Sequence, residues 1–324
     1  MVVLIRGDRL HAETIEWARR QVVELERYGI TPKLSVLLLN DDPVELETQA
    51  KFVSLKARDI RAVGGEIEVH ELYRVPPERR EAEALRLVKR LAARDDVTGI
   101  LVQKPLPPFI NESRVIETIP PAKDVDGLTT STRRRLLAGF DLNRDILPCT
   151  PAGVLELFRL YGVGVKGRDV AIIGKGSLVG LPLAIMLMQL DATVTVLHIM
   201  SKDKLYYIKN ADIVISAVGR PPELYREGAW RLTGDMIKPG AVVVGIGGKY
   251  DPITRRWYFD VDERTVAERA SYLTPNIGGV GLATRARLVK NLVIATRVIA
   301  ARLLPPRALA ELLPAETQGL SGHA

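Results

Sequence analysis

The sequence predicts a two-domain α/β protein, and three observations carry this prediction. The chain has 324 residues, about twice the length of a typical single domain. Long amphipathic stretches alternate with short apolar runs, which is the pattern of parallel sheets built from βαβ units. One apolar run leads straight into a glycine-rich turn and a helix, an arrangement in which the backbone can approach a pyrophosphate. The second domain is therefore expected to be of the Rossmann type and to bind a dinucleotide.

The first half of the chain is expected to form a parallel sheet of its own. Its strands are predicted at Leu34–Leu39, Glu66–Leu72 and Thr98–Gln103, and its helices near residues 11–28, 43–63 and 77–93. The second helix has the best-defined ends. Asp42 can cap its first turn, Pro43 suits the first helical position, and Gly64 suits the end.

The stretch from Ile119 to Pro151 is rich in proline and charge, and it is interpreted as the crossing between the two domains. Beyond it, a helix is predicted at Ala152–Tyr161, and strands are predicted at Asp169–Ile173, Thr193–His198, Ile213–Val218, Ala241–Ile246 and Ser271–Thr274. An apolar-striped helix from about Leu282 to Leu304 is ended by two prolines and is long enough to return to the first domain. The expected division is 1–147 plus 283–304, then 148–282 for the dinucleotide domain, and 305–324 as a tail.

Composition and charge exclude several classes of protein. Apolar residues make up 47% and charged residues 26%, as in ordinary globular proteins, so wholesale disorder is excluded. The 46 basic and 39 acidic residues are interleaved, which suits an anionic small molecule at least as well as nucleic acid. The single Cys149 cannot form an internal disulfide, and the four histidines have no zinc spacing, so no metal is expected. With no signal peptide and no bilayer-length apolar run, the chain is expected to be cytoplasmic and not to bind membranes.

The glycine-rich turn after the strand at 169–173 is the first candidate site, and its candidate contacts are Gly174, Lys175, Gly176, Ser177 and Gly180. A standard fingerprint would have its third glycine at Val179, so a plain tight turn remains the alternative. The next strand ends in His198, followed by Ser201 and Lys202, where an NAD site usually has an acidic residue. Cationic and hydroxyl donors suit a 2′-phosphate and favour NADP over NAD, unless the lysines are merely solvated.

A second candidate site lies in the first domain. Gln49, Phe52 and Lys56 are three and four residues apart, so they share one stripe of the predicted helix. A lysine facing a cleft could have a pKa lowered by desolvation and exchange protons near neutral pH, although most single lysines are simply solvated. Gln103 ends a predicted strand, and ligands in open α/β sheets bind beyond the carboxyl ends of strands.

Two loops complete the candidate residues. In the run Lys123-Asp-Val-Asp-Gly127, Asp124 and Asp126 either position a substrate amine or form a turn. The run from Thr274 to Gly281 either reverses the chain or brings backbone close to a ligand.

Six motifs in order resemble one family. They are the aromatic and lysine pair Phe52 and Lys56, Gly99-Ile-Leu-Val-Gln103 with Pro105-Leu-Pro107, Lys123-Asp-Val-Asp-Gly127, Pro148-Cys-Thr-Pro151, the loop from Gly174 to Pro182, and Gly278-Gly-Val-Gly281. Over residues 1–304 the chain resembles the bifunctional methylenetetrahydrofolate dehydrogenase/methenyltetrahydrofolate cyclohydrolase family.

The resemblance implies a folate cleft between an N-terminal catalytic domain and an NADP domain of the Rossmann type, and commonly a homodimer. It implies that Lys56 is catalytic, that Gln103 tunes this lysine, and that Asp126 holds the pterin. The substrate contacts it implies are Phe52, Gln49, Pro275, Gly278 and Gly279. The cofactor contacts it implies are Thr150, Gly174, Lys175, Gly176, Ser177, Gly180, His198, Ser201, Lys202, Val218, Gly219 and Thr284.

Several positions depart from the family pattern. Phe52 stands where the family usually has tyrosine, which keeps a ring but removes a hydroxyl, and Gln49 is a possible replacement for the usual serine. In the nucleotide loop, Gly176 and Leu181 replace a serine and an arginine. The sequence therefore leaves open a dehydrogenase without hydrolase activity, a dehydrogenase for another small substrate, and a non-catalytic or nucleic-acid-binding protein.

Overall fold

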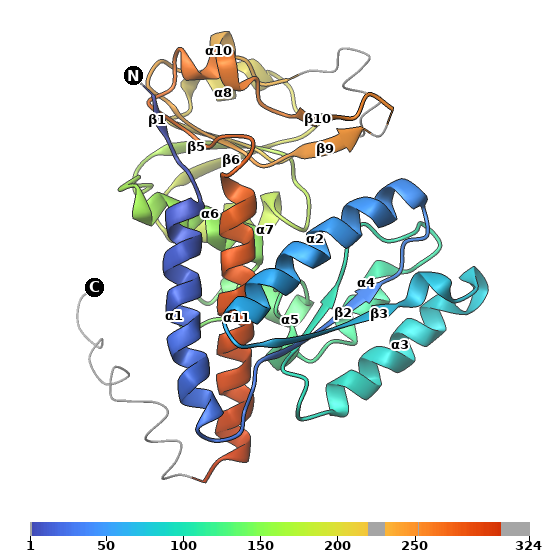
Figure 1. The fold of residues 1–324 in the computed structure, drawn as a ribbon. Helices are drawn as coiled ribbons and strands as arrows, with labels where there is room; N and C mark the ends of the chain where they lie inside the picture. Colours follow the sequence, from blue (N-terminus) through green and yellow to red (C-terminus); the bar gives the residue numbers. More distant parts are fainter. Residues whose placement is uncertain (1, 220–230, 252, 306–324) are drawn as a thin grey trace. The chain divides into compact units, whose positions relative to one another are not determined.

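The computed structural model describes residues 2–219, 231–251 and 253–305, and they form two compact units (Figure 1). Among the described residues, unit 1 contains those from 2 to 14 and from 126 to 288, and unit 2 contains those from 15 to 125 and from 289 to 305. The boundaries of these units differ from the predicted domain boundaries, because residues 2–14, 126–147 and 283–288 group with unit 1. The expected tail lies outside the described residues from position 306 onward.

Unit 1 is built on a six-stranded parallel sheet. Its strands, in spatial order, are β1 (Val3–Leu4), β11 (Tyr272–Leu273), β8 (Val242–Gly245), β7 (Ile213–Ser216), β5 (Asp169–Ile173) and β6 (Thr193–Leu197). Five of the six were predicted. The sixth, β1, is two residues long and pairs with β11, so the start of the chain forms one edge of this sheet.

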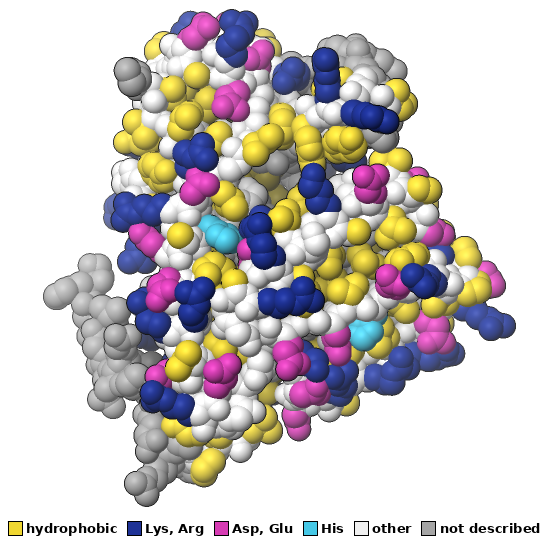
Figure 2. All heavy atoms as spheres, viewed as in Figure 1, with side chains coloured by type: hydrophobic (Ala, Val, Ile, Leu, Met, Phe, Trp, Pro, Cys, Tyr) yellow, Lys and Arg dark blue, Asp and Glu magenta, His cyan; other side chains and the backbone are white. Residues whose placement is uncertain are grey.

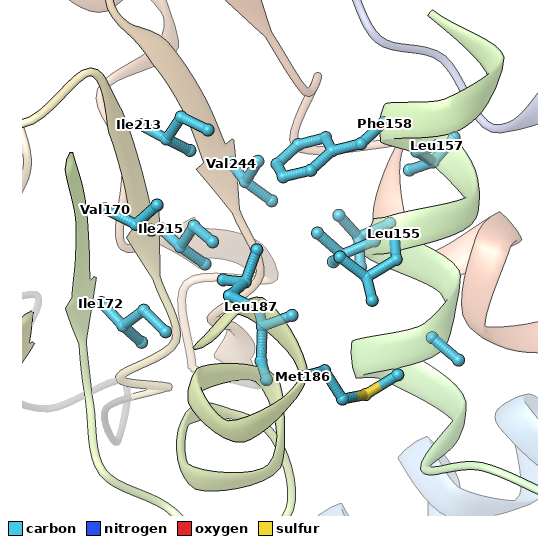
Figure 3. Close-up of a cluster of buried hydrophobic side chains, with 14 of the residues drawn as sticks. Leu155, Leu157, Phe158, Val170, Ile172, Met186, Leu187, Ile213, Ile215 and Val244 are labelled. Atoms are coloured by element: carbon cyan, nitrogen blue, oxygen red, sulfur yellow. The ribbon is translucent and has the colours of Figure 1, made fainter. Parts of the chain in front are cut away.

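This sheet is accompanied by helices, a 3-10 turn and a hairpin. The helices are α5 (Thr130–Leu136), α6 (Cys149–Leu160), α7 (Gly180–Gln189), α8 (Lys204–Asn210) and α10 (Glu263–Ala267). The 3-10 turn is η3 (Gly234–Met236), and the hairpin is formed by β9 (Gly248–Asp251) and β10 (Arg256–Phe259). Figure 3 shows the core, where α6 and α7 meet β5, β7 and β8. The contacts are largely aliphatic, as the low aromatic content predicts, and Phe158 is the aromatic residue among the buried members of the cluster.

Unit 2 holds a three-stranded parallel sheet in the order β3 (Glu66–Glu71), β2 (Lys33–Leu38) and β4 (Gly99–Val102). Its other elements are α1 (Asp8–Glu26, which begins in unit 1), α2 (Pro43–Ala62), α3 (Pro77–Ala93), α4 (Glu112–Glu117) and the short 3-10 turns η1 (Leu72–Arg74) and η2 (Pro121–Lys123). The predicted cap of α2 is confirmed, because the Asp42 carboxylate accepts from the amides of Val44 and Glu45, both at 3.0 Å.

The last helix, α11 (Val280–Leu303), contributes its residues up to 288 to unit 1 and the remainder to unit 2. In unit 2, Asn291 Nδ2 donates to the carbonyl oxygen of Val125 at 2.8 Å, and Thr296 Oγ1 donates to Thr98 Oγ1 at 2.8 Å. The part of this helix beyond residue 288 therefore packs within unit 2, as its length allows. None of the described helices combines the length and the apolar character needed to cross a bilayer.

Candidate active site

In each sheet, the strands that follow the first central strand in sequence are added first on one of its sides and then on the other. The place where this change of side occurs is the reversal point of the sheet. In unit 2 this point lies between β2 and β4, and in unit 1 it lies between β5 and β7. Crevices beyond the carboxyl ends of strands at such points are where open α/β sheets bind ligands. Gln103 follows β4 and Gly174 follows β5, so both sequence-predicted sites lie at the expected positions in their sheets.

Lys56 and Gln103 are in contact in unit 2. Lys56, on α2, donates from Nζ to Gln103 Oε1 at 2.7 Å. Gln103 is only 8% exposed, and its Nε2 donates to the carbonyl oxygen of Lys104 at 3.0 Å. Because the amide nitrogen is committed to that carbonyl, the amide oxygen is held toward the lysine. The geometry brings together the two residues that the sequence paired, and their catalytic role stays a prediction.

Gln49 shares the same face of α2 and holds the loop after β4. It is 1% exposed, and its Nε2 donates to the carbonyl oxygen of Pro105 at 2.7 Å. Asn40, two residues beyond the end of β2, donates to the same carbonyl at 3.1 Å. Sequence reasoning missed Asn40, although a polar residue at the end of a buried strand was a usable signal. The Phe52 ring is 41% exposed, so it presents an apolar surface beside Lys56.

The sequence did not predict the structural role of Lys123. Its side chain is 7% exposed, and Nζ donates to the carbonyl oxygens of Leu91, Ala92 and Arg94 at 3.2, 2.9 and 2.6 Å. These carbonyls end α3, so the lysine satisfies acceptors that the helix leaves open. Burial lowers the pKa of Lys123 below the ordinary lysine value. The following acid, Asp124, is buried and bridges to β4 at Ile100.

The glycine turn of unit 1 requires two of its glycines for steric reasons. Gly174 has a φ of +114°, and a Cβ there would lie 2.5 Å from the carbonyl oxygen of Ala217. A Cβ on Gly180 would overlap the carbonyl oxygen of Gly174. Lys175, Gly176 and Ser177, by contrast, are exposed.

Helix α7 begins directly at this turn, and its N-cap residue, Val179, makes no side-chain capping hydrogen bond. The amide of Leu181 donates to the carbonyl oxygen of Gly176 at 3.1 Å, so the closely approaching backbone and the positive end of the helix dipole are what fit an anionic phosphate. The turn therefore has the chemistry of a dinucleotide site.

The turn after β6 lies beside the glycine turn, because the amide of Gly174 donates to the carbonyl oxygen of Leu197 at 2.8 Å. Two predicted side chains shape this turn. The amide of His198 donates to Ser201 Oγ at 2.9 Å, and the amide of Met200 donates to His198 Nδ1 at 3.2 Å. Lys202 is exposed like Lys175, so two cations flank adjacent turns of the sheet edge.

The remaining predicted contacts also lie in unit 1. Thr284 Oγ1 lies 3.1 Å from Thr150 Oγ1, at the starts of α11 and α6. The amide of Gly7 donates to the carbonyl oxygen of Gly278 at 2.8 Å, so the loop after β11 packs on the first turn of the chain. The other predicted members of this unit are Asp126, Val218, Gly219, Pro275 and Gly279. The structure thus groups Gln49, Phe52, Lys56 and Gln103 in unit 2, and all other predicted site residues in unit 1.

Two family models match the chain. The model described as "Tetrahydrofolate dehydrogenase/cyclohydrolase, catalytic domain" matches residues 5–126. The model described as "Tetrahydrofolate dehydrogenase/cyclohydrolase, NAD(P)-binding domain" matches residues 148–300. Together they cover both predicted sites.

Similar proteins agree with these matches. A bifunctional protein FolD of Pyrobaculum neutrophilum is 72% identical over 309 residues, covering 95% of this chain and 99% of that protein. The crystal structure of the bifunctional FolD methylenetetrahydrofolate dehydrogenase/cyclohydrolase of Campylobacter jejuni is 34% identical, with a TM-score of 0.82 over 92% of this chain and 99% of that one. A Trypanosoma brucei FolD, solved with NADP and an inhibitor, is 32% identical with a TM-score of 0.80, covering 92% and 98%. The chain therefore belongs to the tetrahydrofolate dehydrogenase/cyclohydrolase family.

Proposed function

We propose that this chain oxidises 5,10-methylenetetrahydrofolate with NADP and then hydrolyses the product. In the first reaction the one-carbon bridge loses a hydride and becomes the methenyl cation, while NADP is reduced. In the second, water adds to the methenyl carbon, one carbon–nitrogen bond breaks, and 10-formyltetrahydrofolate and a proton are released. The observation that carries the proposal is the contact between Lys56 and Gln103 in a chain that belongs to this family.

Lys56 is the group proposed to move protons in the hydrolysis. Water attack requires one proton to leave the incoming oxygen and another to reach the departing nitrogen, and a positioned amine can serve both transfers. Gln103 accepts a hydrogen bond from Lys56 Nζ at 2.7 Å, which fixes the direction of the ammonium group. Phe52 is proposed to stack on the pterin, Gln49 to line the same site, and Asp126 to hold the pterin through its amine.

The dinucleotide is proposed to bind in unit 1. When bound, its oxidised nicotinamide supplies the hydride acceptor. Gly174, Gly180 and the N-terminal end of α7 would hold the pyrophosphate. Thr150, Thr284 and residues 218–219 would hold the remainder of the cofactor. The first reaction then depends chiefly on positioning, because the substrate nitrogens can supply the electrons.

NADP is proposed over NAD because two exposed cations, Lys175 and Lys202, flank the adjacent turns after β5 and β6. Such groups suit a 2′-phosphate. A cytoplasmic homodimer is further proposed from the family resemblance. Sedimentation at micromolar concentrations should then give twice the mass of one chain.

The test is an assay of the purified protein with methylenetetrahydrofolate and each nicotinamide cofactor, following the absorbance of the methenyl product and its decay. The expected result is rapid formation with NADP, slower formation with NAD, and decay faster than in buffer alone. Absence of methenyl product with both cofactors would contradict the proposed function. Formation without accelerated decay would leave only the dehydrogenase reaction.

A further inference from the structure

Asp260 is a buried acid that the proposed reactions do not use. It follows β10 and is 3% exposed. Both of its main-chain groups are bound to neighbouring segments: its amide donates to the carbonyl oxygen of Gly247 at 3.0 Å, and its carbonyl accepts from the amide of Leu232 at 2.8 Å. The carboxylate is therefore held in one place by the backbone on both sides.

One carboxylate oxygen of Asp260 accepts hydrogen bonds from three donors at the end of β7 and in the loop that follows it. Oδ2 accepts from the amide of Val218 at 2.8 Å, from the amide of Gly219 at 3.2 Å, and from Ser216 Oγ at 3.2 Å. Ser216 is fully buried. Hydrogen bonds from amides to a carboxylate are about twice as strong as those between neutral groups, so the loop from 216 to 219 is fixed from behind.

This loop is in contact with the glycine turn. A Cβ on residue 174 would lie only 2.5 Å from the carbonyl oxygen of Ala217. The amide of Ala217 donates to the carbonyl oxygen of Ile173 at 2.8 Å. The position of the Asp260 carboxylate therefore sets the position of Ala217 and, through it, one wall of the turn at Gly174.

We propose that Asp260 is a positioning residue for the dinucleotide, acting through the loop at 217–219. This rests on the proposed function, because it concerns the loop that would contact the cofactor. The amides of Val218 and Gly219 are committed to Asp260, so these two groups do not bind phosphate. The phosphates are left to the glycine turn and α7, and the 217–219 loop serves the nicotinamide and ribose half of the cofactor.

The first test replaces the carboxylate with its neutral isostere. In Asp260→Asn, the side chain keeps its size but loses its charge and one of its two acceptors. The dissociation constant for NADP, measured by calorimetry, should rise about tenfold, as expected for weakening one or two charge-assisted hydrogen bonds. KM for NADP should rise with it. KM for methylenetetrahydrofolate and the rate of methenyl hydrolysis, which needs no dinucleotide, should stay at the wild-type values.

Asp262→Asn is the matched control. Asp262 is two residues away, and its carboxylate accepts from the amide of Thr265 at 3.1 Å as the cap of α10. Asparagine caps helices as well as aspartate does, so this variant should bind NADP like the wild type. The proposal is overturned if Asp260→Asn binds NADP as tightly as the control. It is also overturned if hydrolysis and thermal stability fall in step with NADP affinity.

Hydrogen exchange on the unaltered protein tests the same claim if Asp260→Asn does not fold. Without nucleotide, the amides of Val218 and Gly219 should exchange at least ten times more slowly than open loop amides, and free exchange of both would overturn the proposal. If the wild type is protected there but binds no dinucleotide, the proposed function fails while the loop geometry holds.

Discussion

The amide of Gln103 and the ammonium of Lys56 come from elements 47 residues apart in the chain. The sequence predicted both positions, because one ends a strand at a ligand-binding edge and the other lies on a stripe with Gln49 and Phe52. The shared contact of Asn40 and Gln49 with Pro105 could not be predicted. It depends on the path of the backbone after β4, and no local pattern encodes that path.

Replacing Gln103 with glutamate places a carboxylate beside Lys56 in the same space. An opposite charge at hydrogen-bond distance favours the protonated lysine and raises its pKa, by about 1 unit or more in a partly buried site. If neutral Lys56 acts as the base, the pH at which methenyl hydrolysis accelerates should move upward in Gln103→Glu. The pH profile of hydrolysis checks this, with the dehydrogenase rate as the internal control. An unchanged profile would show that this contact does not tune the lysine.

Phe52 offers a gain-of-function test. Its ring is 41% exposed beside Lys56, and tyrosine adds one hydroxyl at the ring edge without changing the apolar surface. Phe52→Tyr should increase the hydrolysis rate by supplying a further proton donor, and it should leave dehydrogenation nearly unchanged. The ratio of the two rates measures the effect. A lower hydrolysis rate in the variant would show that the site is built around the ring alone.

At the scale of elements, the long periodic segments were predicted to within a few residues, whereas strand β1 and the β9–β10 hairpin were missed. Strands β2 to β8 and helices α2, α3, α6 and α11 carry apolar patterns of sufficient length. Strand β1 has two residues, and it exists because β11 offers an open edge. The β9–β10 hairpin was missed because its alternating charged and aromatic residues bury no continuous face, although Trp257 and Phe259 stack with centroids 6.1 Å apart.

The end of α3 depends on Lys123. Its removal in Lys123→Met would leave three carbonyls near the helix end without their donor, which should lower the free energy of unfolding by about 2 kcal/mol. Urea unfolding measures this, and Lys89→Met, an exposed lysine on the same helix, should have little effect.

The pH dependence of this difference has a definite sign. Because burial lowers the pKa of Lys123, the unfolded chain binds its proton more tightly than the folded one. The wild type should therefore gain stability over Lys123→Met as the pH rises through the lowered pKa toward the ordinary value of 10.5. A difference that is constant over this alkaline range would contradict the assignment.

At the scale of the whole molecule, each unit carries its own reversal point and its own set of predicted residues. The sequence predicted two domains and a long returning helix, but not that the first residues would join the far sheet. That pairing links residues about 270 apart, beyond the reach of local patterns. On the face drawn in Figure 2, basic and acidic side chains are interleaved. This mixing of signs accompanies an excess of seven positive charges over the whole sequence.

Lys56 is proposed to move protons in hydrolysis, whereas dehydrogenation is proposed to depend on positioning. The most direct test measures both rates in Lys56→Ala, with Lys51→Ala, an exposed lysine on the same helix, as the control. Hydrolysis should fall by about 100-fold or more, the usual contribution of a general acid or base. Dehydrogenation should fall much less, and the control should match the wild type. Equal losses of both activities in Lys56→Ala, or no loss in either, would contradict the role proposed for Lys56.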